Sequence, residues 1–219
     1  MPANDLALLV EAARLAGQIA LQYWRNAPKV WDKGAQGPVS EADIAVNDRL
    51  ADLLQRARPG YGWLSEETPD TPARLSCEYV FIIDPIDGTR AFIEGDPGFS
   101  HSLAIAQNGR ITAAVVYLPA KDRLFTAATT TPALRDGAPM QVSSQTDPET
   151  ASLMTSKGNL SPEYWTGPPP AATRVFRPSL AHRLCLVADG TVDALLTLRP
   201  TWEWDIAAGA LSPSAPGPK

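Results

Sequence analysis

Apolar residues recur at helical spacing over two segments near the start of the chain. The first runs from Asn4, a candidate N-cap residue, to about Asn26, and the second follows Ser40, which also favours the N-cap position. A loop containing Gly34, Gly37 and Pro38 separates the two, and residues 58–60 (Arg-Pro-Gly) close the second. The pattern therefore predicts two amphipathic helices.

Short apolar runs follow the second predicted helix and indicate strands. Residues 61–64 and 79–83 are too short for helices, and each run ends directly in acidic residues. Residues 99–107, 111–118 and 123–128 have the pattern of a meander, in which Asn108-Gly109 is a strong hairpin signal. We expect an antiparallel sheet there, with carboxylates placed at the ends of strands.

Residues 129–175 are rich in Thr, Pro, Ser and Gly, which favours a boundary between two parts of the chain. We place residues 1–150 in a part with helices and the antiparallel sheet, and residues 151–219 in a smaller α/β part. In the latter, Ser179 should cap a helix reaching about Ala188, and 192–198 should form a strand. Trp204-Asp205 then leads into a helix of small residues, with Asp205 as a candidate N-cap.

Composition narrows the classes of function. The 219 residues are 44% hydrophobic and carry a net charge of −5, which argues against binding a nucleic-acid polymer. No apolar run approaches the roughly 20 residues that span a membrane, and the start has no signal-peptide pattern, so we expect a cytoplasmic protein without membrane contacts. Only two cysteines, Cys77 and Cys185, and two histidines are present. Each cysteine is expected to be a small buried hydrophobe, and a metal would be bound by oxygen.

Three acidic motifs carry the candidate chemistry. Residues 84–89 (Asp-Pro-Ile-Asp-Gly-Thr) place two aspartates three positions apart after a buried strand, and a glycine then permits a tight turn. Ser65-Glu66-Glu67 and Trp204-Asp205 are weaker signals, because a solvated loop and an ordinary N-cap explain them as well. Two cations bound by oxygen need carboxylates from separate segments, and the three motifs together satisfy that requirement.

The motifs resemble the inositol monophosphatase family. The strings LSEE (64–67), DPIDGTRAFIEG (84–95) and WDIAAG (204–209), with GPVSEAD (37–43) upstream, occur in that family's order and spacing. The resemblance implies a layered αβαβα sandwich and a lithium-sensitive phosphomonoesterase that uses two or three Mg²⁺ ions. It also implies a small phosphorylated metabolite as substrate, direct attack by water, and a homodimer as the usual assembly.

The resemblance also implies roles for individual residues. Glu66, Asp84 and Asp87, with the carbonyl of Ile86, would hold the first Mg²⁺, and Asp84, Asp87 and Asp205 would hold the second. Asp43 would support a third ion, and Thr89, aided by Glu66, would orient the attacking water. The amides of Gly88 and Thr89 would bind phosphate oxygens, and Asp87 and Asp205 would also contact the substrate.

The subfamily is less sharply indicated. Ser179-Leu180, residues 185–190 and the Leu-Ser-Glu-Glu string resemble the CysQ type, the 3′(2′),5′-bisphosphate nucleotidases. Residues 89–93 (Thr-Arg-Ala-Phe-Ile) also resemble histidinol-phosphate phosphatases, and an inositol-1-monophosphatase is a further alternative.

Four basic residues have two interpretations each. Arg90 is either a substrate contact or the partner of a surface salt bridge. Lys33 lies where a loop lysine of the family approaches the metal site. Arg177 and Arg183 would meet a second phosphate or an adenine ring, and the competing interpretation of these side chains is a solvated charge.

The end of the chain departs from the resemblance. Where the family continues an apolar helix after WDxAAG, residues 212–219 contain three prolines. We therefore expect a C-terminus that is truncated or frameshifted and a sandwich that is incomplete there. A genuine short form is the other interpretation, and an inactive relative that still binds phosphate is an alternative from a different functional class.

Overall fold

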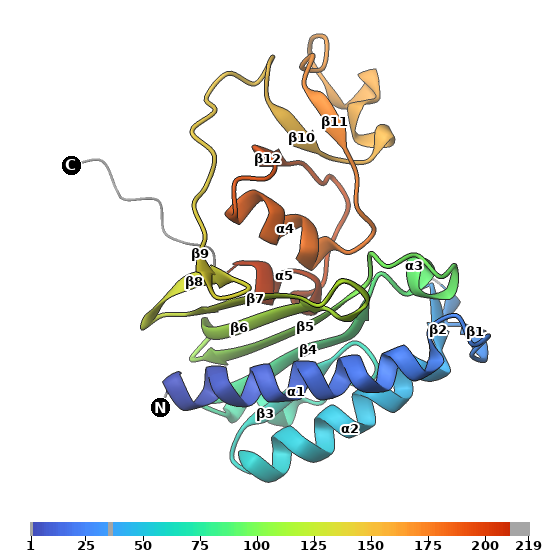
Figure 1. Ribbon diagram of the computed structural model, residues 1–219, viewed down its shortest axis with the longest axis vertical. Helices are drawn as coiled ribbons and strands as arrows, with labels where there is room; N and C mark the ends of the chain where they lie inside the picture. The colour runs from blue at the N-terminus through green and yellow to red at the C-terminus, as the bar shows by residue number, and fades with distance from the viewer. Residues whose placement is uncertain (1, 35–36, 211–219) are drawn as a thin grey trace.

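The computed structural model describes residues 2–34 and 37–210, which are arranged in layers (Figure 1). Helices α1 (Pro2–Tyr23) and α2 (Glu41–Ala57) cover one face of a large sheet, and α4 (Leu180–Ala188) and α5 (Glu203–Ala210) cover the other. A small sheet lies beyond α4. These are four layers of the predicted αβαβα sandwich, and the one other α-helix among the described residues, α3 (Thr89–Ile93), lies at the end of the large sheet and adds no layer.

The large sheet contains seven strands in the order β3-β4-β5-β6-β7-β8-β9. Only β3 and β4 are parallel, and the other neighbours are antiparallel. The strands are β3 (Gly62–Ser65), β4 (Tyr79–Asp87), β5 (Ser100–Gln107), β6 (Arg110–Leu118), β7 (Arg123–Ala128), β8 (Thr131–Arg135) and β9 (Ala138–Pro139). The predicted meander is confirmed, and Asn108 and Gly109 form its first turn with the positive φ angles that such a turn needs.

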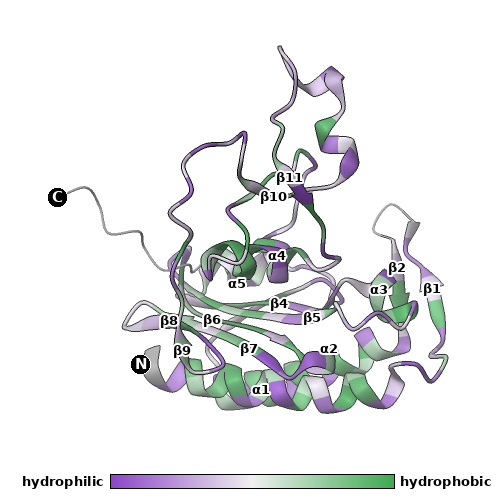
Figure 2. Ribbon diagram, turned by 45° about the horizontal axis from the view of Figure 1, so that its top comes forward, coloured by the Kyte–Doolittle hydropathy of each residue, from purple (hydrophilic) through white to green (hydrophobic). Residues whose placement is uncertain are grey.

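Alternation along the strands divides the core between the two faces of the sheet. On β5, Leu103 and Ile105 join the cluster beneath α1 and α2, as does Phe99 just before the strand, whereas Ala104 faces α4 and α5. Figure 2 shows apolar and polar residues alternating along α1, as expected for a helix with one buried face. The sheet is therefore held on both sides, and its strand ends are fixed.

The second part of the chain forms a small parallel sheet in the order β11-β10-β12. Its strands are β10 (Ser152–Met154), β11 (Thr173–Val175) and β12 (Ala194–Leu195). The remaining elements are the hairpin of β1 (Val30–Asp32) and β2 (Pro38–Ser40), helix α3 (Thr89–Ile93), and the 3-10 helices η2 (Pro72–Ser76), η3 (Pro119–Lys121), η4 (Lys157–Leu160) and η5 (Pro162–Tyr164).

Several predicted boundaries need correction. The first helix begins at Pro2, so Asn4 lies inside it and is not its N-cap; proline is well suited to a first turn. The predicted strand 79–83 continues to Asp87, and the predicted strand 192–198 is reduced to Ala194–Leu195. Asp205 lies inside the first turn of α5, where its Oδ2 accepts the Trp202 N–H at 2.9 Å, so it is not the N-cap.

Other expectations are confirmed or lie outside the described residues. Ser40 and Ser179 cap α2 and α4 as predicted. The division near residue 150 stays a prediction, and the expected truncation concerns residues 212–219, outside the described residues. Within the part of the chain that the structure covers, no helix is long and apolar enough to cross a membrane.

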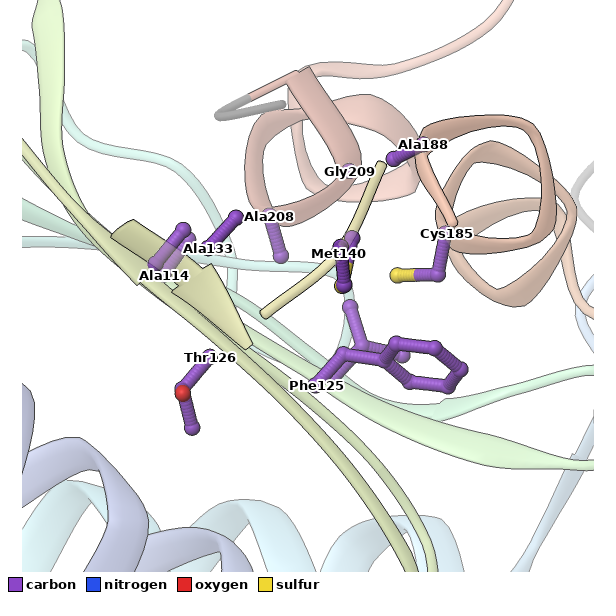
Figure 3. Close-up of a pocket in the computed structure, with 11 residues that line it drawn as sticks. Ala114, Phe125, Thr126, Ala133, Met140, Cys185, Ala188, Ala208 and Gly209 are labelled. Carbon is purple, nitrogen blue, oxygen red and sulfur yellow. The ribbon is translucent and has the colours of Figure 1, made fainter. Parts of the chain in front are cut away.

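A small cavity of about 20 Å³ lies between the sheet and the helix pair α4 and α5 (Figure 3). Alanines line much of it, and the sulfur of Cys185 lies near Met140 and Phe125. Both cysteines are free thiols, and burial raises the pKa of Cys185, so this thiol behaves as the small hydrophobe expected from the sequence, whereas Cys77 is only half-buried. The cavity could hold one water by size, but its apolar lining keeps it dry.

The close approach of α5 to α4 depends on Gly209. A Cβ at this position would lie 2.5 Å from the Cβ of Leu184, closer than real carbon contacts permit. We predict that Gly209→Ala lowers the free energy of unfolding by about 1–3 kcal/mol, because the helices must move apart. Urea denaturation would measure the loss. Gly158→Ala is the matched control, since nothing lies within 4 Å of its added carbon. Equal stability of the two variants would contradict the prediction.

Candidate active site

A cleft of about 940 Å³ opens at the end of the large sheet where the acidic motifs meet. Six carboxylates line it, together with basic side chains and a phenylalanine, and the six are those of Glu66, Asp84, Asp87, Glu94, Asp96 and Asp205. The acidic residues that the sequence singled out are Glu66, Asp84, Asp87 and Asp205, and the structure brings them to this one cleft from three separate segments.

Parallel pairing of β3 and β4 places the first two carboxylates next to each other. Ser65 pairs with Ile83, so Glu66 and Asp84 both follow a paired position at the same sheet end. The N–H of Glu66 donates to the carbonyl of Ile83 at 3.2 Å and continues the pairing by one residue. The apolar runs before these acids are buried in the sheet, and this fixes where the acids emerge.

A β-bulge separates Asp84 from Asp87. Asp84 pairs with Ser102 and Asp87 pairs with Ser100, so two residues of β4 face the single residue His101 of β5. Gly88 then adopts a left-handed conformation (φ 96°) that turns the chain into α3. The bulge and the glycine together direct both aspartates toward the cleft.

Asp87 is held by the N-terminus of α4. Its Oδ2 accepts the Ser179 hydroxyl and the Ala181 N–H, both at 2.7 Å, and its Oδ1 accepts the Leu180 N–H at 3.2 Å. Burial raises the pKa of Asp87 to about 6, although these hydrogen bonds oppose the shift. The residues at the start of α4 thus position a carboxylate that lies at the end of β4.

Asp43 and Thr89 form a buried pair beside the cleft. Asp43 accepts the N–H and the hydroxyl of Ser40 on Oδ2, which completes a capping box at the start of α2. Its Oδ1 lies 3.1 Å from the Thr89 hydroxyl, which lies equally close to the Ile86 carbonyl. Burial raises the pKa of Asp43 to about 6. The pair links the Ile86 carbonyl to the helix start.

Lys33, on the loop between β1 and β2, contacts the acidic pair. Its Nζ lies 2.8 Å from Glu67 and 3.3 Å from Glu66. Burial raises the pKa of Glu66 to about 7, while Lys33 opposes the shift. Of the two adjacent acids, Glu67 is the one whose side chain is almost fully buried, so the expectation of a solvated loop fails for it.

Asp84 is the buried acid of the cleft whose negative charge is least compensated. Only 2% of the residue is exposed, and its Oδ1 has no hydrogen-bond partner in the described chain. Burial raises the pKa of Asp84 well above its ordinary value, and the charges of Glu66, Asp87, Asp205 and Asp43 raise it further. An orphaned carboxylate oxygen among other oxygen ligands fits a hard cation such as Mg²⁺.

The side chains do not form a closed ion cage by themselves. Among the described residues, no three His, Cys, Asp or Glu side chains are grouped as a ready-made metal site. Two of the expected ligands are engaged elsewhere, since Glu66 contacts Lys33 and both oxygens of Asp87 accept from α4. Asp84 and the oxygen atoms of the neighbouring acids are therefore the features of the cleft that fit a cation.

The cleft also contains basic side chains. Arg90, Lys121, Arg177 and Arg199 are exposed and line the cleft, and no carboxylate lies within salt-bridge distance of them in the part of the chain described. Partial burial lowers the pKa of Lys121, the negative charge of Asp96 opposes this shift, and the positive charge of Arg177 adds to it. We call Lys121, Arg177 and Arg199 the cationic rim.

Arg183 has a different place from the one predicted. Its guanidinium donates to the carbonyls of Arg177 and Pro178 and lies 4.3 Å from the ring centre of Phe176. It is 7% exposed, so it is neither a solvated charge nor free for substrate. It supports the 176–178 segment, where Phe176 keeps 45% of its surface exposed.

Some residues of the site were not identified from the sequence. Phe176, Lys121 and Arg199 carry no motif, and only the fold brings them to the cleft. His101 was likewise given no role from the sequence. The sequence feature that could have identified it is the alternation Phe99, His101, Leu103, which places a histidine at a core position of β5.

Comparisons with known proteins agree on one family. The sequence profile of the inositol monophosphatase family matches residues 2–211. Inositol monophosphatase 3 of Solanum lycopersicum is 33% identical over 94% of this chain and 81% of its own length. The histidinol-phosphatase of Chlorobaculum parvum is 31% identical over 75% of this chain and 62% of its own. The solved Thermotoga maritima IMPase superposes with a TM-score of 0.83 at 28% identity, covering 96% of this chain and 81% of that one.

The burial of Asp84 generates a prediction about stability and pH. Because its folded pKa is above the ordinary 3.8, its contribution to stability is present at low pH and is lost as pH rises toward the folded value. In EDTA, the melting temperature of Asp84→Asn minus that of the wild type should therefore increase from pH 5 to pH 8. Mg²⁺ should raise the melting temperature of the wild type only.

Asp193→Asn is a control for which the opposite pH dependence of stability is expected. The Ser143 hydroxyl, with the N–H and hydroxyl of Ser152, lowers the pKa of Asp193, so its contribution is present above pH 4 and is lost on acidification. This variant should be destabilised at pH 8. A pH-independent difference between Asp84→Asn and the wild type would show that Asp84 is not a buried, unpaired acid.

Proposed function

Because the chain belongs to the inositol monophosphatase family and is thus a phosphoric monoester hydrolase, we propose that it hydrolyses a small phosphorylated metabolite with Mg²⁺ bound by the carboxylates of its cleft. The observation that carries the metal dependence is Asp84, a buried carboxylate with an unpartnered oxygen among other acids. Lithium sensitivity and a homodimer, both implied by the resemblance, belong to the same proposal, as does the cytoplasmic location expected from the sequence.

The proposed ligands follow from the placement of the acids. Glu66, Asp84, Asp87 and the Ile86 carbonyl would hold one ion, Asp84, Asp87 and Asp205 a second, and Asp43 would support a third. When bound, Mg²⁺ supplies charge neutralisation at the phosphoryl group and a lowered pKa of the attacking water. Lys33 would have to release Glu66 for this set to form, since its ammonium now lies 3.3 Å from that carboxylate.

Thr89 and Asp43 are suited to orient the nucleophile. If the Thr89 hydroxyl donates its proton to Asp43, its remaining lone pairs can accept from a water in the cleft. Glu66, whose pKa burial raises to about 7, can hold or release a proton near neutral pH. The amides of Gly88 and Thr89 open α3 at the cleft and would bind phosphate oxygens.

For the substrate, we propose adenosine 3′,5′-bisphosphate, which would give AMP and phosphate. The resemblance of residues 179–190 to the CysQ type supports it, and so does the cationic rim, which offers a place for a second phosphate. The exposed ring of Phe176 lies beside the rim and has one face on Arg183, which suits stacking with a base. Inositol 1-phosphate and histidinol phosphate are the alternatives, supported by the names of the relatives.

An inactive relative that only binds phosphate is the alternative from another class. It rests on the tail beyond Ala210, which lies outside the described residues. Phosphate binding without turnover of any phosphomonoester would favour it over an enzyme.

We predict phosphate release from a small phosphomonoester that stops in EDTA and returns with Mg²⁺. Asp87→Asn should lower kcat by at least about 10²-fold, because it removes a carboxylate that both proposed ions share. Circular dichroism should show an intact fold. Full turnover in excess EDTA would rule out the metal mechanism, and an active Asp87→Asn variant would make Asp87 only a cap for α4.

We predict a higher kcat/KM for adenosine 3′,5′-bisphosphate than for inositol 1-phosphate. Arg177→Gln should reduce kcat/KM for the bisphosphate by at least about tenfold, since an ionic hydrogen bond is lost, and should leave the inositol substrate unaffected. Arg110→Gln, an exposed arginine outside the cleft, is the control. The reverse substrate ranking, with no effect of Arg177→Gln, would favour an inositol monophosphatase.

A further inference from the structure

His101 is fully buried at the bulge that separates the two central aspartates. It is the single residue of β5 that faces Pro85 and Ile86 of β4. Its ring lies between Phe99 and Tyr117, with ring centres 6.3 and 6.4 Å away. A histidine among aromatic core residues loses its hydration, so a polar contact must compensate for its presence there.

That contact is a hydrogen bond to the bulge. The Nδ1 atom of His101 lies within hydrogen-bonding distance of the Pro85 carbonyl oxygen. A carbonyl only accepts, so Nδ1 must carry the proton, and the ring is neutral because burial lowers its pKa to about 4. The Nε2 atom is left without a partner in the described chain.

We propose that His101 is a positioning residue that fixes the Pro85–Ile86 peptide and thereby the directions of Asp84 and Asp87. The inference rests on the proposed function, in which these aspartates bind Mg²⁺. It assigns to His101 no contact with substrate or metal. Its only role is to donate one hydrogen bond at the bulge.

The local geometry explains why a side chain must supply this bond. Proline has no N–H to donate, and the bulge interrupts the regular pairing between residues 84 and 87, so the Pro85 carbonyl lies outside the regular ladder and the His101 side chain supplies its donor. The Thr89 hydroxyl lies 3.1 Å from both the Asp43 carboxylate and the Ile86 carbonyl, and in the proposed function its single proton goes to Asp43, so it does not hold the next peptide. His101 thus fixes a peptide plane between the aspartates, and preorganised ligands need tolerances of about 0.5 Å.

The chain contains its own comparison in His182. This second histidine is also buried, and burial lowers its pKa to about 3, but neither of its ring nitrogens has a partner among the described residues. It lies on α4 against Phe125, and it makes no hydrogen bond to the Pro85 carbonyl, whose partner is His101. Replacing it tests the loss of a buried imidazole without the loss of the hydrogen bond.

The experiment compares the wild type with His101→Leu, His101→Asn and His182→Leu. Asparagine places an N–H donor near the position of Nδ1, whereas leucine keeps much of the volume without a donor. Isothermal titration calorimetry measures Mg²⁺ binding without substrate, and steady-state kinetics with Mg²⁺ measures kcat. His101→Leu should weaken Mg²⁺ binding and lower kcat by about 10- to 100-fold, and the other two variants should stay within about threefold of the wild type.

Two outcomes would overturn the proposal. One is Mg²⁺ binding by His101→Leu equal to that of the wild type, and the other is an equal loss in His101→Asn and His101→Leu, which would assign the effect to ring packing. If the leucine variant does not fold, ¹⁵N-histidine NMR of the wild type decides. A proton on Nδ1 of His101 supports the role, and a proton on Nε2 excludes it.

The failure of the proposed function gives a different result. Wild-type protein that binds Mg²⁺ but releases no phosphate would overturn the enzymatic proposal, while the order of Mg²⁺ affinities among the variants would still decide the role of His101.

Discussion

The repulsion among buried carboxylates at one end of the large sheet is the constraint on which the site depends. Burial and neighbouring acids raise the pKa of Asp84, and burial raises that of Asp87 and Glu66. The protein supplies positive partners to two of these, through Lys33 and the N-terminus of α4. The Oδ1 atom of Asp84 has no such partner among the described residues, so the uncompensated negative charge lies at the centre of the cleft.

The layers of the fold hold in place the segments that carry the acidic side chains of this centre. The core beneath α1 and α2 fixes β3 and β4, and α4 returns from the second part of the chain to hold Asp87. Helix α5 brings Asp205 to the same cleft and packs on α4 through the close contact of Gly209 with Leu184. Stability and ligand placement are therefore coupled, because loosening α4 against α5 moves groups on both sides of the cleft.

The sequence predicted those features that depend on local pattern. Glu66 and Asp84 were expected at strand ends because apolar runs precede them, and the parallel pairing of β3 with β4 then makes them neighbours. The bulge was missed, since Asp84-Pro85 was interpreted as the end of a strand, and only the long-range register with β5 shows that pairing resumes at Asp87. The role of Arg183 was wrong for a similar reason, because its partners are carbonyls of a loop that no periodicity describes.

The cleft holds both carboxylates and basic side chains, and this mixture of charges affects how an anion is oriented in it. A phosphate placed among the carboxylates is repelled until metal reverses the local charge, whereas the cationic rim attracts anions at all times. The chain has a net charge of −5, so three cations that have no salt-bridge partner in the described part contrast strongly with the overall negative charge. A substrate with one phosphate has two competing positions in such a cleft, at the metal end and at the rim. A substrate with two anionic groups occupies both positions at once. The charge contrast that would misplace a substrate with one phosphate therefore orients a substrate with two.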